Sequence, residues 1–196
     1  MKQVKDSIKK SEESLSYTVE VTDKEGRVLQ RISAPSRCYV EQWNKLLNVQ
    51  AKQTNLTIKD TSGNNQDIPP SSTCISADAG IGNINTGFRV GKGTTAVDIT
   101  NYALGAPCGE GTGEDEFNHQ QMQWSEPSVA GSDCSFKLWR VMSNQSGATI
   151  TGIKELGCHV HMTGLFALAF RDVLPSAVYV PHGGAITVTY TIKVTV

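Results

Sequence analysis

The sequence has little net charge and no long apolar run. Its 196 residues carry 18 Lys and Arg against 19 Asp and Glu, which gives a formal net charge of -1. Proteins that bind duplex nucleic acid usually show a basic surplus, so the charge argues against nucleic acid as a partner. No apolar stretch approaches the roughly 18 residues of a membrane-spanning helix, so we expect no membrane segment. Residues 1–10 lack an apolar core, and we expect no secretory signal there.

Cysteine pairs and catalytic motifs are also missing. The chain has no CxxC pair, and its five cysteines are widely spaced: Cys38, Cys74, Cys108, Cys134 and Cys158. An odd number of cysteines without a signal peptide predicts reduced thiols in a protein made in the cytoplasm, and disulfides are the alternative if the protein later meets an oxidising medium. The GxSxG, HExxH, Rossmann and Walker motifs are absent. We therefore predict a protein that is not an enzyme and has no cofactor.

The sequence does contain strand-like alternation and many turn residues. Only 19% of the residues are charged and 18 are glycine, a composition typical of all-β proteins. Apolar side chains take every second position at the end of the chain: Ile186, Val188, Tyr190, Ile192, Val194 and Val196. Because successive strand side chains point to opposite faces, this pattern predicts a long antiparallel strand in the middle of a sheet, with one face in the core.

Other segments carry shorter versions of the same pattern. Residues 16–22 and 27–32 flank the turn Asp23–Gly26 and predict a hairpin. Further strands are predicted near residues 55–59, 117–124, 135–141, 148–153, 154–162, 165–170 and 178–180. A single helix is predicted from a cap at Ser36 to about Gln50, because Val40, Trp43, Leu46 and Leu47 recur at helical spacing. We expect Trp43 to belong to the core.

These elements predict the fold class and the domain organisation. About nine or ten strands separated by turns indicate an all-β, antiparallel β-sandwich, jelly-roll-like, with one short helix near residues 36–50. We expect residues 16–196 to form a single β-sandwich domain. Residues 1–15 are polar and predict an N-terminal arm, either free in solution or ordered on a neighbouring subunit.

Three loops are the candidates for contacts and ligands. The irregular stretch 68–87 is typical of a working surface or a subunit contact. In the glycine-rich loop 105–116, four carboxylates offer oxygen atoms of the kind that calcium binds, but the EF-hand spacing is absent and we expect a solvated loop: Glu110, Glu114, Asp115 and Glu116. Residues 91–95 predict a hairpin turn rather than a phosphate loop, because the GxxxxGK[ST] spacing is absent.

One cluster contains residues that commonly bind metals. Cys158, His159 and His161 are close in sequence, but on a strand the two histidines share a face while Cys158 points away. The cluster therefore offers two ligands rather than three. His159 and His161 are the metal candidates, and we favour the alternative, two surface histidines without a metal.

Three parts of the C-terminal half resemble virion structural proteins of tailed bacteriophages, in the same order along the chain. They are residues 90–104 (VGKGTTAVDITNYAL), residues 140–157 with Asn144–Ile150 and Lys154–Gly157, and residues 171–174 with Val180–Ile192. The resemblance covers roughly residues 88–196, and a weaker similarity lies in residues 36–47 and 57–63. These are patterns of strands and turns rather than active-site motifs, so no functional residue can be transferred.

The resemblance implies a non-enzymatic β-sandwich subunit present in many copies in a phage particle, made in the host cytoplasm. A decoration or cement protein that binds the major capsid protein is the first expectation, and a tail, neck or fibre-adaptor component is the second. A binding module for host carbohydrate is a third, but loops 64–87 and 105–116 lack Trp and Tyr for sugar stacking. A homo-oligomer is expected in either class. Candidate partner-binding positions are Lys2, Lys9, Ile81, Ile84, Glu110 and Glu114.

Overall fold

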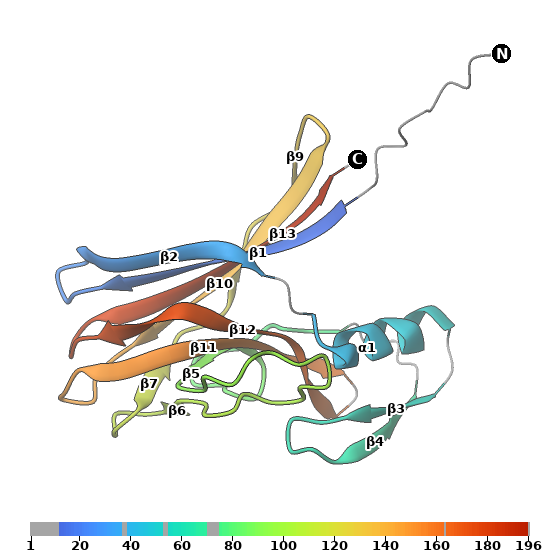
Figure 1. Ribbon diagram of the computed structural model, residues 1–196, viewed down its shortest axis with the longest axis horizontal. Helices are drawn as coiled ribbons and strands as arrows, with labels where there is room; N and C mark the ends of the chain where they lie inside the picture. Colours follow the sequence, from blue (N-terminus) through green and yellow to red (C-terminus); the bar gives the residue numbers. More distant parts are fainter. Residues whose placement is uncertain (1–11, 37–38, 53–54, 70–74, 163, 196) are drawn as a thin grey trace.

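The computed structural model describes residues 12–36, 39–52, 55–69, 75–162 and 164–195 (Figure 1). This part of the chain forms thirteen β-strands and a single α-helix, which confirms the all-β class. Residues 1–11 of the predicted arm, with Lys2 and Lys9, lie outside the described residues. Residues 12–15 belong to the first strand, four residues earlier than the alternation predicted, because their backbone pairs with the last strand.

The element bounds are β1 (Glu12–Thr22), β2 (Val28–Ser36), α1 (Glu41–Lys52), β3 (Leu56–Lys59), β4 (Asn65–Ile68), β5 (Gly87–Gly91), β6 (Gly109–Glu110), β7 (Glu116–His119), β8 (Gln123–Trp124), β9 (Ser128–Ala130), β10 (Asp133–Ser143), β11 (Ile150–Met162), β12 (Leu165–Val180) and β13 (Ala185–Thr195). The larger sheet has the order β2-β1-β13-β10-β7-β6, with β8 and β9 also paired to β10. A smaller sheet has the order β12-β11-β5, and β3 pairs with β4.

The last strand lies in the middle of the larger sheet, as its alternation predicted. β13 pairs with β1 on one side and β10 on the other. Ile186, Val188 and Tyr190 are fully buried on its inner face. The hairpin β1–β2 is confirmed as well, since the Asp23 carboxylate accepts bonds from the backbone amides of Glu25 and Arg27 and holds the turn.

The smaller sheet contains longer strands than the sequence suggested. Residues 165–170 and 178–180 belong to one strand, β12, which continues past Pro175. Pro175 lacks an amide hydrogen, and it lies where the pairing with β11 is irregular, between Val173 and Val178. The predicted strands 148–153 and 154–162 likewise form one strand, β11, with register shifts near Gly152 that its positive φ of 74° accommodates.

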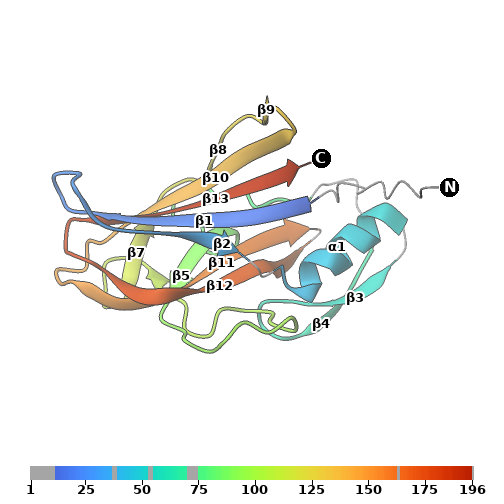
Figure 2. The ribbon, with the colours of Figure 1, turned by 45° about the horizontal axis from the view of Figure 1, so that its top comes forward.

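The core lies where the inner faces of these two sheets meet. The Tyr190 ring of β13 contacts Phe88 of β5 at 5.0 Å and Phe170 of β12 at 4.7 Å between centroids. Its hydroxyl donates to Asp172 at 2.8 Å. Figure 2 shows the two layers, with β1, β10 and β13 above β11 and β12. Burial in the core raises the pKa of the Tyr190 hydroxyl well above its ordinary value.

The helix begins later than predicted. α1 starts at Glu41, whereas Ser36 is the last residue of β2. The buried Ser36 hydroxyl donates to Asp172 instead of capping the helix. The helix packs against β12 and β3, and its entry is fixed by the Val40 amide, which donates to the Ala169 carbonyl. Trp43 is only partly buried, at the margin of the core, where it stacks on Tyr39.

Candidate functional site

The chain between β5 and β6 crosses the outer face of the smaller sheet, and we name residues 92–106 the crossing loop. It leaves β5 at Gly91 and returns where Pro107 bridges to Gly91, so the predicted hairpin turn at 91–95 is wrong. The ends of the loop are joined because the Lys92 amide donates to the Ala106 carbonyl at 2.8 Å. A wide loop, rather than a tight turn, therefore covers β5 and β11.

A buried ion pair holds the crossing loop to the sheet. The Glu155 carboxylate accepts bonds from Arg171 Nε at 2.6 Å, the Gly105 amide at 2.8 Å and the Ala106 amide at 3.2 Å. The Arg171 guanidinium also donates to the Thr95 carbonyl at 3.1 Å. The Arg171 and Glu155 side chains are almost completely buried, at 3% and 0% exposed. We name this arrangement the Arg171–Glu155 clamp, and it joins the crossing loop to β11 and β12.

A second cluster of hydrogen bonds joins the turn after β10 to the turn before β13. The Asn144 side chain is fully buried and donates from Nδ2 to the carbonyls of Ala148 and Val180, both at 2.8 Å. Its backbone exchanges bonds with Gly183 and Gly184, also at 2.8 Å. Residues 144–148 and 180–184 therefore form one unit next to the start of β13. Both clusters therefore have a structural role in this fold, because each fixes a loop.

Arg140 fixes the stretch that was predicted as a working surface. Its guanidinium is fully buried and donates to five carbonyls, those of Gly80, Asn83, Thr86, Phe88 and Gln120. Burial lowers its pKa to about 10. Of the two predicted contact residues in this stretch, Ile81 is 74% exposed and Ile84 is only partly exposed. Buried hydrogen bonds from Arg140 thus hold residues 80–88, and Ile81 is exposed to solvent there.

The acidic loop 105–116 divides its carboxylates among separate partners. Glu110 accepts a bond from His119 Nδ1 at 2.6 Å, and Glu116 accepts one from the Gly113 amide. Asp115 pairs with Lys92, while Glu114 is exposed. Burial lowers the pKa of His119, and the Glu110 carboxylate opposes that shift without cancelling it. Glu110 therefore has a structural partner, and Glu114 remains available for contacts.

The cysteine and histidine segment of β11 does not bring its residues to one point. Cys158 points into the core, and His159 is 5% exposed, so the prediction of two surface histidines is wrong for His159. His161 is half-buried, and its Nε2 accepts a bond from the Gly164 amide at 3.2 Å. Within the described residues no three His, Cys, Asp or Glu side chains are grouped as metal ligands. The free thiols described are Cys108, Cys134 and Cys158.

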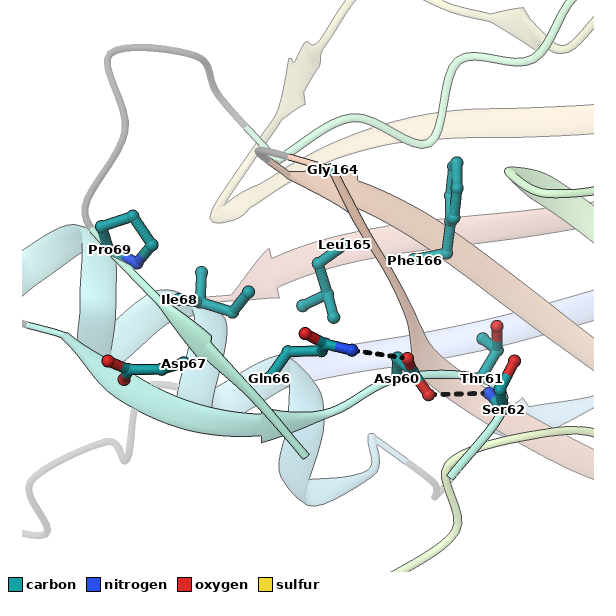
Figure 3. Close-up of a pocket in the computed structure, with 10 residues that line it drawn as sticks. All are labelled: Asp60, Thr61, Ser62, Gln66, Asp67, Ile68, Pro69, Gly164, Leu165 and Phe166. Atoms are coloured by element: carbon teal, nitrogen blue, oxygen red, sulfur yellow. Dashed lines mark hydrogen bonds between the residues drawn. The ribbon is translucent and has the colours of Figure 1, made fainter. Parts of the chain in front are cut away.

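A hollow of about 290 Å³ lies between the β3–β4 hairpin and the start of β12 (Figure 3). Its Asp60 carboxylate accepts bonds from the Ser62 and Asn64 amides and from Gln66, so it holds the turn. Figure 3 shows Asp67 pointing away from Asp60. Paired carboxylates that attack a glycosidic bond must face one cleft, and these two do not.

The larger sheet extends beyond the smaller one at the end where β9 and the described ends of the chain lie (Figure 1). We name this part the projecting end: residues 12–14, 128–130, 133–135 and 193–195. One face carries an apolar row, because Cys134 pairs with Val129 on one side and with Val194 on the other. Val129 is 76% exposed, Val194 is 42% exposed, and Cys134 is exposed.

This row continues the core-facing side of the sheet into solvent. Phe136 and Ile192 come next on the same face and are partly buried. They border an apolar groove of about 140 Å³, which is lined by Trp43, Ile75, Ala77, Trp124, Phe136, Leu138, Cys158, Val160, Phe170 and Ile192. The pairing of β1 with β2 stops at Leu15, so among the described residues Glu12–Ser14 have a neighbouring strand on one side only. The projecting end therefore combines an open backbone edge with an apolar face.

The sequence contained a signal for the projecting end that the predictions did not use. The alternation of β13 continues to Val194, beyond the residues that the smaller sheet covers.

No helix in the described part of the chain has the length and apolar character needed to cross a membrane. No protein-family model matches the chain, and searches of curated proteins and of solved structures find no match either.

Proposed function

We propose that this chain is a non-enzymatic structural subunit of a tailed-bacteriophage particle, a decoration or cement protein that binds the head shell through its projecting end. The observation that carries the proposal is the exposed row of Val129, Cys134 and Val194 on a sheet whose edge is open. Exposed apolar rows and unpaired strand edges are costly for a free monomer and are covered in assemblies. The major capsid protein is the proposed partner, in a particle assembled in the host cytoplasm.

The way the chain uses its buried polar groups supports this proposal. Arg140, Asn144 and the Arg171–Glu155 clamp all bond to the backbone of loops rather than converging on one open cavity. Such groups make long loops rigid, and a rigid surface loses less conformational entropy when it binds a lattice of identical partners. A homo-oligomer on the particle is part of the proposal, because a shell presents its sites with symmetry.

We also infer that the two larger sheets are the layers of a β-sandwich with jelly-roll-like connections. The ring contacts between Tyr190 and Phe88 or Phe170 support the face-to-face packing. The last strand, β13, returns to lie beside β1, as a Greek-key connection requires. An experimental structure in which the inner faces of the sheets lay apart would contradict this inference.

Cryo-electron microscopy of purified particles tests the proposal directly. The particles would come from the phage that encodes this chain, and particles lacking the protein would be mixed with purified recombinant protein. We expect regular density on the head shell, and we expect particles without the protein to lose their contents at a lower temperature. Density on the tail or neck would move the chain to the second expected class, and absence from the particle would overturn the proposal.

Two variants test whether the projecting end makes the contact. The double substitution V129D/V194D places charge in the apolar row, and we expect it to weaken particle binding at least about tenfold, as central interface residues do. Val28→Asp is the matched control, because Val28 is also an exposed valine but lies at the opposite end of β1 and β2. Equal binding by the two variants would exclude the projecting end as the contact surface.

A further inference from the structure

A small polar pocket lies under the crossing loop, on the outer face of the smaller sheet. β5 pairs with β11 so that Arg89 is opposite Gly157 and Gly87 is opposite His159. Arg89 and His159 therefore share one face of the sheet, and the Leu104 side chain of the crossing loop packs on Gly157 beside them. The result is a cavity of about 180 Å³, with His159 and Arg89 in its wall and Leu104 and Pro107 of the covering chain above them.

Two residues that line the pocket each carry a buried nitrogen atom without a hydrogen-bond partner among the described residues. Arg89 Nε and His159 Nε2 are both buried, and neither has a hydrogen bond within the described part of the chain. The Arg89 guanidinium makes a bond of 2.6 Å from Nη2 to the Cys108 carbonyl, and no carboxylate among the described residues pairs with it. An unsatisfied buried polar atom destabilises the folded protein, and an unpaired charge destabilises it more.

We propose that this pocket is a binding site for a small oxyanion of the phosphate or carboxylate class. A guanidinium presents planar donors that match the oxygen atoms of both groups, and no carboxylate of the described chain neutralises the charge of Arg89. His159 supplies a second contact for phosphate. Its ring hydrogen-bonds the backbone of Asn85, which leaves Nε2 to accept a bond from a protonated phosphate oxygen.

The size and charge of the pocket exclude other ligand classes. At about 180 Å³ it is smaller than the roughly 300–1,000 Å³ of sites for drug-sized ligands, but it exceeds the volume of several waters of about 30 Å³ each. A metal ion is disfavoured because the Arg89 charge repels it. A sugar is disfavoured because the wall contains no Trp or Tyr to stack on. A single small anion, with the water that accompanies it, fits these limits.

Calorimetric titration with inorganic phosphate, and separately with acetate, tests the site and distinguishes the two anion types. We expect the purified wild-type protein to bind one equivalent of at least one of them. Arg89→Gln should weaken that binding at least tenfold, and His159→Gln severalfold. Arg89→Lys keeps the charge but not the fork of donors, so it should show intermediate affinity. Arg27→Gln is the control, because Arg27 is an exposed arginine paired with Asp23 at the surface.

Each variant must first show the circular dichroism and the cooperative unfolding of the wild type. If Arg89→Gln does not fold, carbon-13 and nitrogen-15 shifts of the His159 ring in the wild type decide, since they move on binding at the pocket and stay fixed otherwise. Binding that is equal in Arg89→Gln and the wild type, or ring shifts that ignore both anions, would overturn the proposal. These results are independent of whether the protein joins a phage particle.

Discussion

Two arginines on the outer face of the smaller sheet differ in how many hydrogen-bond and ion-pair partners their guanidinium groups have. Arg171 is buried under the crossing loop with a carboxylate and loop oxygens as partners. Arg89 lies partly buried under the end of the same loop, and among the described residues it pairs with one carbonyl and no carboxylate. A charge that is fully paired holds structure, whereas a charge that lacks a partner favours a ligand. The difference separates a structural clamp from a candidate site although both are arginines in one sheet.

The largest effect is expected when the Arg171–Glu155 clamp is broken. Glu155→Gln leaves the Arg171 charge buried without a counter-ion and brings an amide donor to the Ala106 amide. We expect the free energy of unfolding to fall by about 3–5 kcal/mol, as it does when one partner of a buried pair is removed. Denaturant unfolding followed by circular dichroism measures this change.

Two controls make the clamp experiment specific. Glu25→Gln removes a carboxylate from an exposed ion pair with Arg27 and should lose little stability. The double variant E155M/R171M removes both charges and should be more stable than Glu155→Gln, because no unpaired charge remains. A loss smaller than about 1 kcal/mol for Glu155→Gln would show that the clamp does not hold the loop.

The protein should lose stability in acid because His159 is buried as a neutral ring. Burial and the Arg89 charge lower the pKa of His159 to about 4, from 6.5 in the unfolded chain. Between these values the unfolded chain binds a proton that the folded protein does not, so stability falls as the pH falls from about 6.5 to 4. The shift corresponds to about 3 kcal/mol, and thermal unfolding across this pH range would measure it.

His159→Gln isolates this contribution, because it removes the titrating group and leaves His119 and the carboxylates in place. The wild-type stability should decline more steeply with falling pH than that of His159→Gln. Parallel curves for the two proteins would show that His159 is not buried as a neutral ring. Phosphate, if it binds, should reduce the decline in the wild type alone.

Asn144 tests whether a buried side chain with paired hydrogen-bonding groups has a structural role when it carries no charge. Asn144→Ala leaves the carbonyls of Ala148 and Val180 without their buried donor. We expect a loss of about 1–3 kcal/mol in the free energy of unfolding, smaller than for Glu155→Gln because no charge is left unpaired. Gln145→Ala is a suitable neighbour control, since Gln145 also carries a side-chain amide but is exposed. Equal stability of the two variants would contradict the assigned role of Asn144.

The sequence predicted those strands, turns and helices whose structure depends on residues close to one another in the chain. The alternation of β13, the turn at Asp23–Gly26 and the single helix were all visible in the sequence, because side-chain period and turn chemistry act over a few residues. The continuity of β12 through Pro175 was not visible, since it depends on irregular pairing with β11. The start of α1 was missed for a similar reason: Ser36 is held by Asp172, which is distant in sequence.

The candidate pocket depends even more on distant pairing. His159 looks like a surface residue in the sequence, because β11 alternates there without a clear apolar face. Its burial follows from pairing with Gly87 of β5 and from the loop above, and neither can be read from residues near His159. Arg89 gave no signal of its own. The strand that carries His159 could be predicted, but β5 and the proximity of Arg89 to His159 could not.

The smallest effect is expected at Arg89, and it completes the comparison with Arg171. Arg89→Gln removes one bond to the Cys108 carbonyl, but it also removes the cost of partly burying a cation that has no carboxylate partner among the described residues. These contributions oppose each other, so we expect the free energy of unfolding in phosphate-free buffer to change by less than about 1 kcal/mol. With bound phosphate the wild type should gain up to about 2.7 kcal/mol at a hundredfold excess over its dissociation constant, and Arg89→Gln should gain little. A large loss of stability for Arg89→Gln in phosphate-free buffer would place Arg89 with Arg171 as a structural residue.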